Sequence, residues 1–421
     1  MKPIYDVEER PPFTKSLFYG LQHLLACFGA TVLVPMLVGI NPLYALFSAG
    51  IGTLLYLFIT KFKVPNFVGS SFAFIGCAIM VLKTYGPEYL AGGAIVSAVF
   101  YTLIALLVWK AGSGWINKVL PPVVIGPVVA VIGLSLAGTA ISMSGAAEGG
   151  DFVAMLLALA TLAITIIAMF FKNKFVSSIS IVIGLAGGYL LSAIFGRVDY
   201  SAIVAAPIIN LPTFVVPKFN GTVILVFALV SFATICEHIG HTMVTGQIIN
   251  RDVVKNPGLH RTILGDGLAT GIAGLFGSVA NTTYGESLGV MATTKVFSVF
   301  VFIFSGALAI VLSIFGKLGG VLQTIPAHVL GGLCILLYGT IAVNGLKQLV
   351  VNKVDFDKTR NLIIASVIFI LGCGGSVFQL PGSAYPLLTS IAFAAIVGII
   401  LNLVLPKDKE EAAEELSKTV D

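Results

Sequence analysis

The sequence predicts an all-α polytopic membrane protein with fourteen transmembrane segments in a 7+7 inverted repeat. Three observations predict this fold: an apolar composition, charge-free runs of membrane length, and basic residues concentrated in alternate loops. Of the 421 residues, 57% are hydrophobic and only 10% are charged, and the mean hydropathy is +1.02. A soluble domain carries about 25% charged residues, so this composition excludes a water-soluble globular protein.

Apolar runs bounded by charged residues, prolines or glycines define the candidate spans. A helix needs about 20 residues to cross the hydrocarbon core of a bilayer, and residues 119–147 and 152–171 each contain no Asp, Glu, Lys or Arg. The third and tenth runs are poor helices, because GSSFAF (69–74) and NTTYGE (281–286) interrupt them. The predicted spans are 16–39, 43–60, 66–83, 88–109, 119–143, 152–171, 176–196, 222–249, 259–279, 280–294, 297–316, 324–346, 361–380 and 384–405.

The two ends of the chain are polar. The start, MKPIYDVEERPPFTK, lacks the basic-then-apolar order of a secretory signal, so we expect the first span to remain in the protein. Residues 406–421 are expected to form a cytoplasmic tail. Five cysteines are scattered in apolar runs with no CxxC pair or Cys/His cluster, which predicts small buried side chains and no disulfide, metal site or cofactor. They are Cys27, Cys77, Cys236, Cys334 and Cys373.

The distribution of lysine and arginine sets the orientation. With the amino terminus in the cytoplasm, the loops after even-numbered spans are cytoplasmic as well, and twenty of the 24 basic residues then lie inside. This bias follows the positive-inside rule and predicts a plasma-membrane protein with both termini in the cytoplasm. The net charge of +5 largely reflects the bias and needs no nucleic-acid partner. The basic residues predicted outside are Lys83, Arg197, Lys218 and Lys317.

The chain divides into two halves of seven predicted spans, one before and one after about residue 200. An odd number of spans makes the second half enter the membrane from the opposite side, which is an inverted-topology repeat if the halves share a fold. Gln22-His23 stands 215 residues before Glu237-His238, and GSSFAF stands about 213 before NTTYGE. PPVVIG of the fifth span stands 205 residues before PAHVLG of the twelfth. These nearly constant offsets support two related halves.

The interrupted third and tenth segments occupy matching places in the two halves, and such segments indicate the substrate site of a transporter. Irregular backbone at membrane depth is tolerated only where protein or a water-filled cavity satisfies its polar groups. Phe72 and Gly285 lie in these two segments. We therefore expect their backbone amides to be free, to face each other between the repeats and to donate to carbonyl oxygens of a ligand.

Ionisable residues within the spans are functional candidates, because an acidic side chain costs several kcal/mol at the bilayer centre unless it is paired or hydrated. Glu237 and His241 are four residues apart, so they share one face of the eighth span and can interact. Imidazole titrates near neutral pH, which makes His241 a candidate proton carrier. Asp266 is a candidate for proton coupling or for a structural hydrogen bond, and His23 and His238 are expected to be structural. The full set is Glu237, Asp266, Glu286, His23, His238 and His241.

The predicted site combines two carboxylates, which accept hydrogen bonds, with two backbone amides, which donate them. A small, planar, neutral ligand with alternating N–H and carbonyl groups complements this set, and a pyrimidine or oxidised purine base fits it. An inorganic anion would be repelled by Glu237 and Glu286, and a metal ion would require more oxygen ligands. The residues alone predict a small polar substrate that is carried with a proton.

Motifs along nearly the whole chain match a known family. They are LQHLLACFGATVLVP, GSSFAF, EHIGH, KNPGLHR, NTTYGESLGVMATTK and LLYGTIA. With these motifs the chain resembles the nucleobase–ascorbate (nucleobase:cation symporter-2) family, and within it the bacterial uracil permeases. The family signature after the break in the tenth span runs from Glu286 to Lys295, with one departure: Ser287 stands where asparagine is usual.

The resemblance implies a division into two parts with the site between them. A core domain (about 14–110 and 222–320) would move against a gate domain (about 117–200 and 322–405). Two short antiparallel strands, in the third and tenth spans, would build the site. Members of the family are often homodimers, so we expect a homodimer here.

The resemblance also assigns site residues by matching positions. Glu237 and Glu286 would hold the N–H groups of the base, and the amides of Phe72 and Gly285 would hold its carbonyl oxygens. His241 would serve proton coupling. Relatives that take xanthine and urate have glutamine at position 286; a glutamate there favours uracil, because a carboxylate only accepts hydrogen bonds. Tyr284, Tyr338 and Ala30 would line the pocket.

Together these observations predict a proton-coupled symporter that imports uracil by alternating access, with uracil, protons and the lipid bilayer as its partners. An enzyme is not expected, because no nucleophile–base pair or phosphate loop occurs in the sequence. One alternative keeps the mechanism but carries a purine such as xanthine. Another is an anion transporter or channel of the related 7+7 architecture, against which the pair of Glu237 and Glu286 argues.

Overall fold

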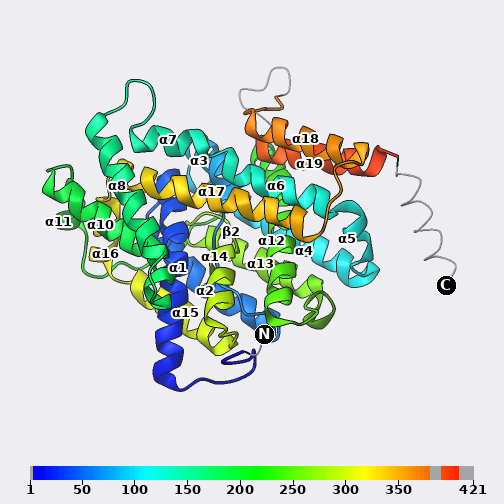
Figure 1. The fold of residues 1–421 in the computed structure, drawn as a ribbon, viewed down its shortest axis with the longest axis horizontal. Helices are drawn as coiled ribbons and strands as arrows, with labels where there is room; N and C mark the ends of the chain where they lie inside the picture. Colours follow the sequence, from blue (N-terminus) through cyan, green and yellow to red (C-terminus); the bar gives the residue numbers. More distant parts are fainter. Residues whose placement is uncertain (1–2, 380–389, 407–421) are drawn as a thin grey trace.

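The computed structural model describes residues 3–379 and 390–406, and this part of the chain is helical apart from two short strands (Figure 1). Seven of its helices are long and apolar enough to cross a membrane, and five shorter apolar helices of 10–17 residues accompany them. The elements are α1 (Phe13–Val38), α2 (Pro42–Ile59), β1 (Val68–Ser70), the 3₁₀ turn η1 (Phe72–Phe74), α3 (Ile75–Thr84), α4 (Pro87–Ala111), α5 (Gly114–Val119), α6 (Pro122–Leu134), α7 (Ala137–Ser144), α8 (Phe152–Met169), α9 (Lys174–Ser178), α10 (Ser180–Ile194), α11 (Ser201–Ala205), α12 (Gly221–Ile249), the π turn η2 (Val254–Gly258), α13 (Leu259–Leu275), β2 (Asn281–Thr283), α14 (Gly285–Thr294), α15 (Val299–Ser313), α16 (Gly316–Gln323), α17 (Ala327–Val351), α18 (Thr359–Cys373) and α19 (Ser390–Val404).

Every range predicted as a span contains a helix, and the breaks fall where the sequence is irregular. The fifth predicted span, 119–143, is divided between α6 and α7. The last, 384–405, is described from residue 390 onward as α19, and the predicted tail lies outside the described residues from position 407. One expectation is wrong: Cys373 at the end of α18 is exposed, whereas the other four cysteines are buried.

The two strands confirm the predicted break in the third and tenth segments. β1 pairs antiparallel with β2, and Gly69 lies opposite Thr282. The ladder extends by one hydrogen bond at each end, from the Ser71 amide to the Ala280 carbonyl (2.9 Å) and from the Tyr284 amide to the Phe67 carbonyl (3.0 Å). The two strands begin 213 residues apart, as do η1 and α14 that follow them. A pseudo-two-fold axis therefore passes through the pair Gly69–Thr282.

Helix packing repeats across this axis. α1 packs against α15 as α12 packs against α4, and α2 packs against α15 as α13 packs against α4. α8 packs against α17 as α18 packs against α6, and α10 packs against α8 as α19 packs against α18. Exchanging the two halves of the chain converts each contact into its counterpart, which is the relation that an inverted repeat requires.

The packing separates a first helix group (α1–α4 and α12–α15) from a second helix group (α6–α8, α10 and α17–α19). In the second group α6 and α17 touch backbone to backbone. A Cβ atom at Gly133 would lie 2.2 Å from the Tyr338 carbonyl oxygen, and one at Gly345 would lie 2.3 Å from the Ala130 amide nitrogen. Small residues let membrane helices approach this closely, where dispersion forces act between them. α6 and α17 therefore pack closely against each other within the second helix group.

The amino-terminal segment, residues 3–11, binds along the end of α14. The Ile4 amide donates to the Lys295 carbonyl (2.8 Å), the Phe297 amide to the Tyr5 carbonyl (2.8 Å) and the Val299 amide to the Val7 carbonyl (3.0 Å). Just beyond α12, Arg251 contacts Glu8 and, at 3.0 Å, Asp6. The segment thereby ties the end of α12 to the end of α14, the two helices that carry the predicted carboxylates.

Replacing Arg251 with glutamine is expected to lower the stability of the folded protein by about 1 kcal/mol or less, because the pair is partly exposed. The hydrogen bond from Arg251 lowers the pKa of the Glu8 carboxyl in the folded state. A lowered folded-state pKa gives stability that is present above the ordinary value and is lost as the pH falls through the folded-state value. The difference in Tm between wild type and variant should therefore vanish in acid, as thermal unfolding of the purified protein at a series of pH values will show.

The matched control for this prediction is Lys255→Gln. Lys255 pairs with Asp252 on the surface with 85% of its side chain exposed, so its loss should leave Tm unchanged. An Arg251→Gln variant with the wild-type Tm at neutral pH would contradict the assignment of this ion pair as an anchor of the amino-terminal segment.

Candidate substrate site between the two helix groups

One cavity of about 470 Å³ lies between α12, the β2–α14 segment and α17, with Phe72 and part of α10 in its wall. It follows α12 from Glu237 to Ile248 and α17 from Leu336 to Val351. The cavity thus extends toward the ends of α12 and α17 that the sequence predicts to be cytoplasmic. Of the predicted site residues, Phe72, Glu237, His241, Tyr284, Gly285 and Glu286 line it.

Two backbone amides at the edge of this cavity follow directly after the strand ladder. The ladder uses the amides of Ser71 and Tyr284, and the next residue on each segment, Phe72 and Gly285, begins a helical turn. The first amides of a helix have no partner within it. In the described part of the chain neither the Phe72 nor the Gly285 amide makes a hydrogen bond. Both are therefore available to an acceptor in the cavity.

The two carboxylates lie in the same cavity. Glu237, in the middle of α12, is 5% exposed, and its Oε2 atom has no hydrogen-bond partner among the described residues. Glu286 is half-buried in the first turn of α14, where the helix dipole favours a negative charge. The two carboxyl groups are close enough for their charges to interact. Acceptor atoms of the protein are therefore concentrated where the cavity meets the buried middle of α12, the closed end of the cavity.

His241 lies beside these groups with a defined tautomer. Its Nδ1 atom is 2.7 Å from the Thr283 carbonyl oxygen, and a carbonyl oxygen only accepts, so Nδ1 carries the hydrogen. The neutral ring then has its lone pair on Nε2, which lies 3.1 Å from the place that a Cβ atom of Gly285 would occupy. The sequence suggested an interaction with Glu237 four residues earlier; the structure instead pairs the ring with Thr283 and leaves Nε2 facing the cavity.

Asp266 is fully buried and does not line the cavity. Its Oδ2 atom is 3.3 Å from Nδ1 of His238, which is also 3.2 Å from the Thr283 hydroxyl. Asp266 therefore lies next to His238, which in turn contacts Thr283 of the site. Sequence reasoning treated His238 as a structural residue and overlooked Thr283, which contacts both histidines of EHIGH. The hydroxyl run in NTTYGE was the available signal for this role.

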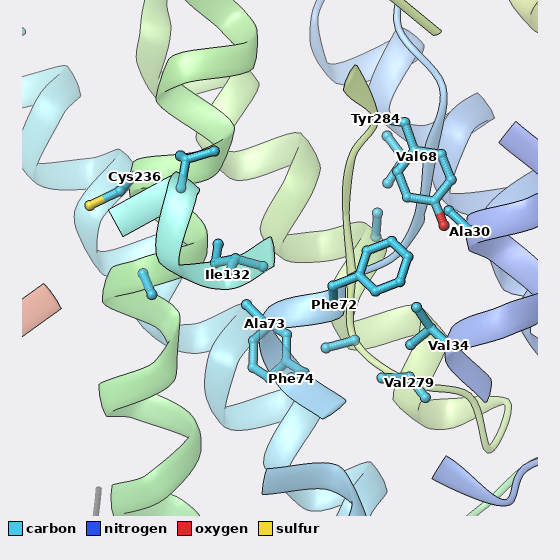
Figure 2. Close-up of a cluster of buried hydrophobic side chains, with 14 of the residues drawn as sticks. Ala30, Val34, Val68, Phe72, Ala73, Phe74, Ile132, Cys236, Val279 and Tyr284 are labelled. Atoms are coloured by element: carbon cyan, nitrogen blue, oxygen red, sulfur yellow. The ribbon is translucent and has the colours of Figure 1, made fainter. Parts of the chain in front are cut away.

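Two residues predicted to line the pocket are not among its lining residues. Tyr338 packs edge-on against the Phe72 ring with 5.5 Å between ring centres, and it is 2% exposed. Ala30 is 1% exposed and lies beside Tyr284 (Figure 2), whose hydroxyl donates to the Ser70 carbonyl (3.0 Å) and accepts from Thr31 (3.3 Å). Tyr338 and Ala30 therefore contact the lining residues Phe72 and Tyr284 (Figure 2) without lining the cavity themselves.

Ser287, where the family signature usually has asparagine, contacts His23 through its hydroxyl, 3.2 Å from Nδ1. Both side chains are buried. This contact ties α1 to α14, one turn from the site, and agrees with the expected structural role of His23. Serine at this position therefore makes a hydrogen bond between the two helices.

One face of α17 forms the opposite wall of the cavity, and none of the α17 residues in that wall was predicted from the sequence. Its polar members are Thr340, Asn344, Lys347 and Gln348. Their helical spacing was the available signal, but polar residues at such spacing also occur on any exposed helix face. Among the described residues no group of three or more His, Cys, Asp or Glu side chains could hold a metal ion.

Replacing Gly69 with alanine is expected to destabilise the protein by about 1–3 kcal/mol, the usual effect of overpacking a tight site, and to lower transport. A Cβ atom at Gly69 would lie 2.7 Å from both Cζ and the hydroxyl of Tyr284. The ring would have to leave the strand pair and the cavity wall. Thermal unfolding and substrate uptake by reconstituted protein measure the two effects.

Gly138→Ala is the control for this substitution, since Gly138 lies in α7 with no atom within 4 Å of the added carbon. It should unfold and transport as the wild type does. Unchanged Tm and uptake in Gly69→Ala would contradict the tight contact between Tyr284 and the strand.

Comparison with known proteins gives a family and a set of relatives. The model of the Permease family (Xan_ur_permease) matches residues 14–380. The chain is 43% identical over 423 residues to the uracil permease of Bacillus caldolyticus, covering 99% of this chain and 97% of that protein. It is 45% identical over 402 residues to the uracil permease of Escherichia coli strain K12, covering 94% and 93%.

Two solved structures share the fold at low sequence identity. The overall structure of SLC26A9 matches with a TM-score of 0.70 and 14% identity, over 93% of this chain and 64% of that one, so this chain spans about two thirds of that protein. The transmembrane domain of the cyanobacterium bicarbonate transporter BicA matches with a TM-score of 0.65 and 16% identity, over 95% of this chain and all of that one. At such identity the likeness shows the fold alone.

Proposed function

Because the chain belongs to the Permease family, in the nucleobase:cation symporter-2 group that its motifs resemble, we propose that it imports uracil across the plasma membrane together with protons. The observation that carries the proposal is the set of hydrogen-bond donors and acceptors around this cavity. Two carboxylates, Glu237 and Glu286, border the same space as the backbone amides of Phe72 and Gly285, which make no hydrogen bond within the described residues.

Uracil complements this set. It has two N–H donors and two carbonyl acceptors around one planar ring, so the carboxylates take the N–H groups and the amides take the carbonyl oxygens. Each buried polar group of the site then has a partner when the base is bound, which is the condition for tight binding of a polar ligand. The uracil permeases to which the chain is 43–45% identical support the same base.

Transport by alternating access uses the two helix groups. In this proposal the first helix group is the core that holds the base, and the second helix group is the gate against which it moves. The cavity reaches the ends of α12 and α17, which we assign to the cytoplasm from the positions of the basic residues, so the structure corresponds to an inward-facing state. The repeated packing across the pseudo-two-fold axis supports a second state in which the two halves exchange conformations and the site opens toward the outside.

The proton is assigned to His241. Its Nδ1–H is engaged by Thr283, so a proton arriving from the cavity binds at Nε2. Uracil is uncharged, and a protonated ring beside Glu237 and Glu286 balances part of their charge in a medium where unpaired charge is costly. Asp266 would stabilise the charged form from behind, through His238.

The alternatives make different demands on the same cavity. An anion, as in the similarly folded bicarbonate transporter BicA, is the second candidate, yet the two carboxylates at the closed end of the cavity oppose an anion. A purine such as xanthine would need a donor for its ring nitrogen acceptor, which the carboxylate of Glu286 does not provide.

The test is uptake of labelled uracil by proteoliposomes with and without an inward proton gradient. We expect accumulation above equilibrium only with the gradient, and competition by unlabelled uracil but not by xanthine or bicarbonate. Uptake that ignores the gradient would remove the proton from the mechanism. Stronger competition by xanthine than by uracil would indicate that the substrate is a purine rather than uracil.

A further inference from the structure

The cavity wall formed by α17 is apolar at one end and polar at the other. Nearest the closed end it is apolar, with Leu336 and Leu337, and toward the open end it carries Asn344, Lys347 and Gln348. Thr340 lies between, but its hydroxyl already donates to the Leu337 carbonyl (2.8 Å). Asn344 is therefore the first side chain on this wall, counted from the closed end, with a free hydrogen-bonding group to offer a ligand.

Asn344 lies directly across from the start of α14. Its Nδ2 atom is 3.8 Å from the place that a Cβ atom of Gly285 would occupy, and Nε2 of His241 is 3.1 Å from the same place. The carboxamide is exposed to the cavity, and within the described residues the structure gives it no hydrogen bond. It comes from the second helix group, whereas Glu237, His241, Gly285 and Glu286 all belong to the first.

We propose that Asn344 is a specificity-determining residue whose Nδ2 atom donates a hydrogen bond to the same substrate carbonyl that the Gly285 amide holds. A carbonyl oxygen has two lone pairs, so it accepts from both donors at once. The inference rests on the proposed function, because it needs a base held by Gly285. It adds a contact from the opposite helix group, so the base is bound by both groups while the cavity is open at the end of α17.

The chemistry of this contact selects for oxygen. A carbonyl accepts two N–H donors at close range, whereas a thiocarbonyl is a weaker and larger acceptor. Replacing the contacted oxygen with sulfur should therefore weaken binding more when both donors are present than when only the Gly285 amide remains. This difference distinguishes a direct contact by Asn344 from a general effect on the shape of the cavity.

The experiment measures equilibrium binding of uracil, 2-thiouracil and 4-thiouracil to purified wild type, Asn344→Leu and Asn344→Asp. Leucine keeps the size of asparagine without a donor, and aspartate keeps its shape with acceptors only. We expect uracil to bind about 3- to 10-fold more weakly to Asn344→Leu, the effect of losing one neutral hydrogen bond, and at least as weakly to Asn344→Asp. For one of the two thiouracils, the loss relative to uracil should be smaller in Asn344→Leu than in wild type.

The matched control is Asn352→Leu, at the end of the same helix and outside the cavity lining, where the side chain donates to the Gln348 carbonyl (2.7 Å). It should bind all three bases as wild type does. Suppose that Asn344→Leu binds uracil with wild-type affinity and loses as much affinity for each thiouracil, relative to uracil, as the wild type does. This result would overturn the assignment of Asn344 while leaving uracil binding intact. Failure of the wild-type protein itself to bind uracil would overturn the proposed function, and this inference with it.

Discussion

Replacing Glu286 with glutamine is expected to weaken uracil binding by about 30- to 150-fold, which corresponds to about 2–3 kcal/mol. The carboxylate stands in the first turn of α14 and lines the cavity next to the free amide of Gly285. It accepts hydrogen bonds on both oxygens, whereas an amide of the same shape has a nitrogen that only donates. Turned one way, the glutamine presents N–H to the N–H of the base; turned the other way, it still loses the charge that strengthens the bond.

The measurement is a binding isotherm for uracil on purified protein, together with uptake by proteoliposomes. Glu286→Asp retains a carboxylate one carbon further from the base and should retain more affinity than glutamine does. Glu148→Gln is the matched control, since Glu148 lies exposed in the loop before α8, and it should behave as wild type. If Glu286→Gln binds uracil normally, Glu286 has no place in the site.

Replacing His241 with alanine is expected to abolish uphill accumulation while exchange of uracil across the membrane continues. One pH unit is worth about 1.4 kcal/mol per proton, so symport of one proton per base allows about tenfold accumulation by the wild type. Without Nε2 to bind the proton, the gradient no longer acts on the base, and the ratio of inside to outside uracil should stay near one. Binding should change less, because the carboxylates and amides remain.

Accumulation and counterflow exchange in the same proteoliposomes separate these two effects. His260→Ala supplies the control, because His260 lies at the start of α13 and outside the cavity lining. Normal accumulation by His241→Ala under an imposed gradient would move the coupling role to another group, with Asp266 the first to examine. Equal loss of exchange and accumulation would indicate a role in holding the site rather than in coupling.

Much of the fold could be predicted because its signals are local. Charge-free runs, the distribution of lysine and arginine, and the hydroxyl-rich NTTYGE segment each act through nearby residues, and the structure has helices in the predicted ranges and strands at the breaks. The grouping of Phe72, Glu237, Gly285 and Glu286 around one cavity was also within reach, because the repeat places the third and tenth segments together.

What the sequence could not predict depends on distant partners. The hydrogen bond from His241 to the Thr283 carbonyl joins two helical segments that only the folded chain brings together. The contact of Tyr338 with Phe72 depends on the rotation of α17 about its axis, and a shift of one residue on that helix separates Leu337 in the lining from Tyr338 outside it. A sequence pattern fixes such a rotation only when one face is uniformly polar, and α17 mixes leucine, threonine and asparagine on the cavity side.

The antiparallel pair at the centre of the site also constrains how the protein is made. β1 and β2 begin 213 residues apart, and a ribosome adding about 5–20 residues per second needs about 10 to 40 s to make that length. During this interval the nascent first half contains β1 without its partner β2. The amides and carbonyls of β1 then lie at a depth in the membrane where unsatisfied backbone groups are costly. Neither half can therefore complete its own interior, and insertion of the nascent chain has to keep residues 68–71 hydrated or shielded until the second half is synthesised.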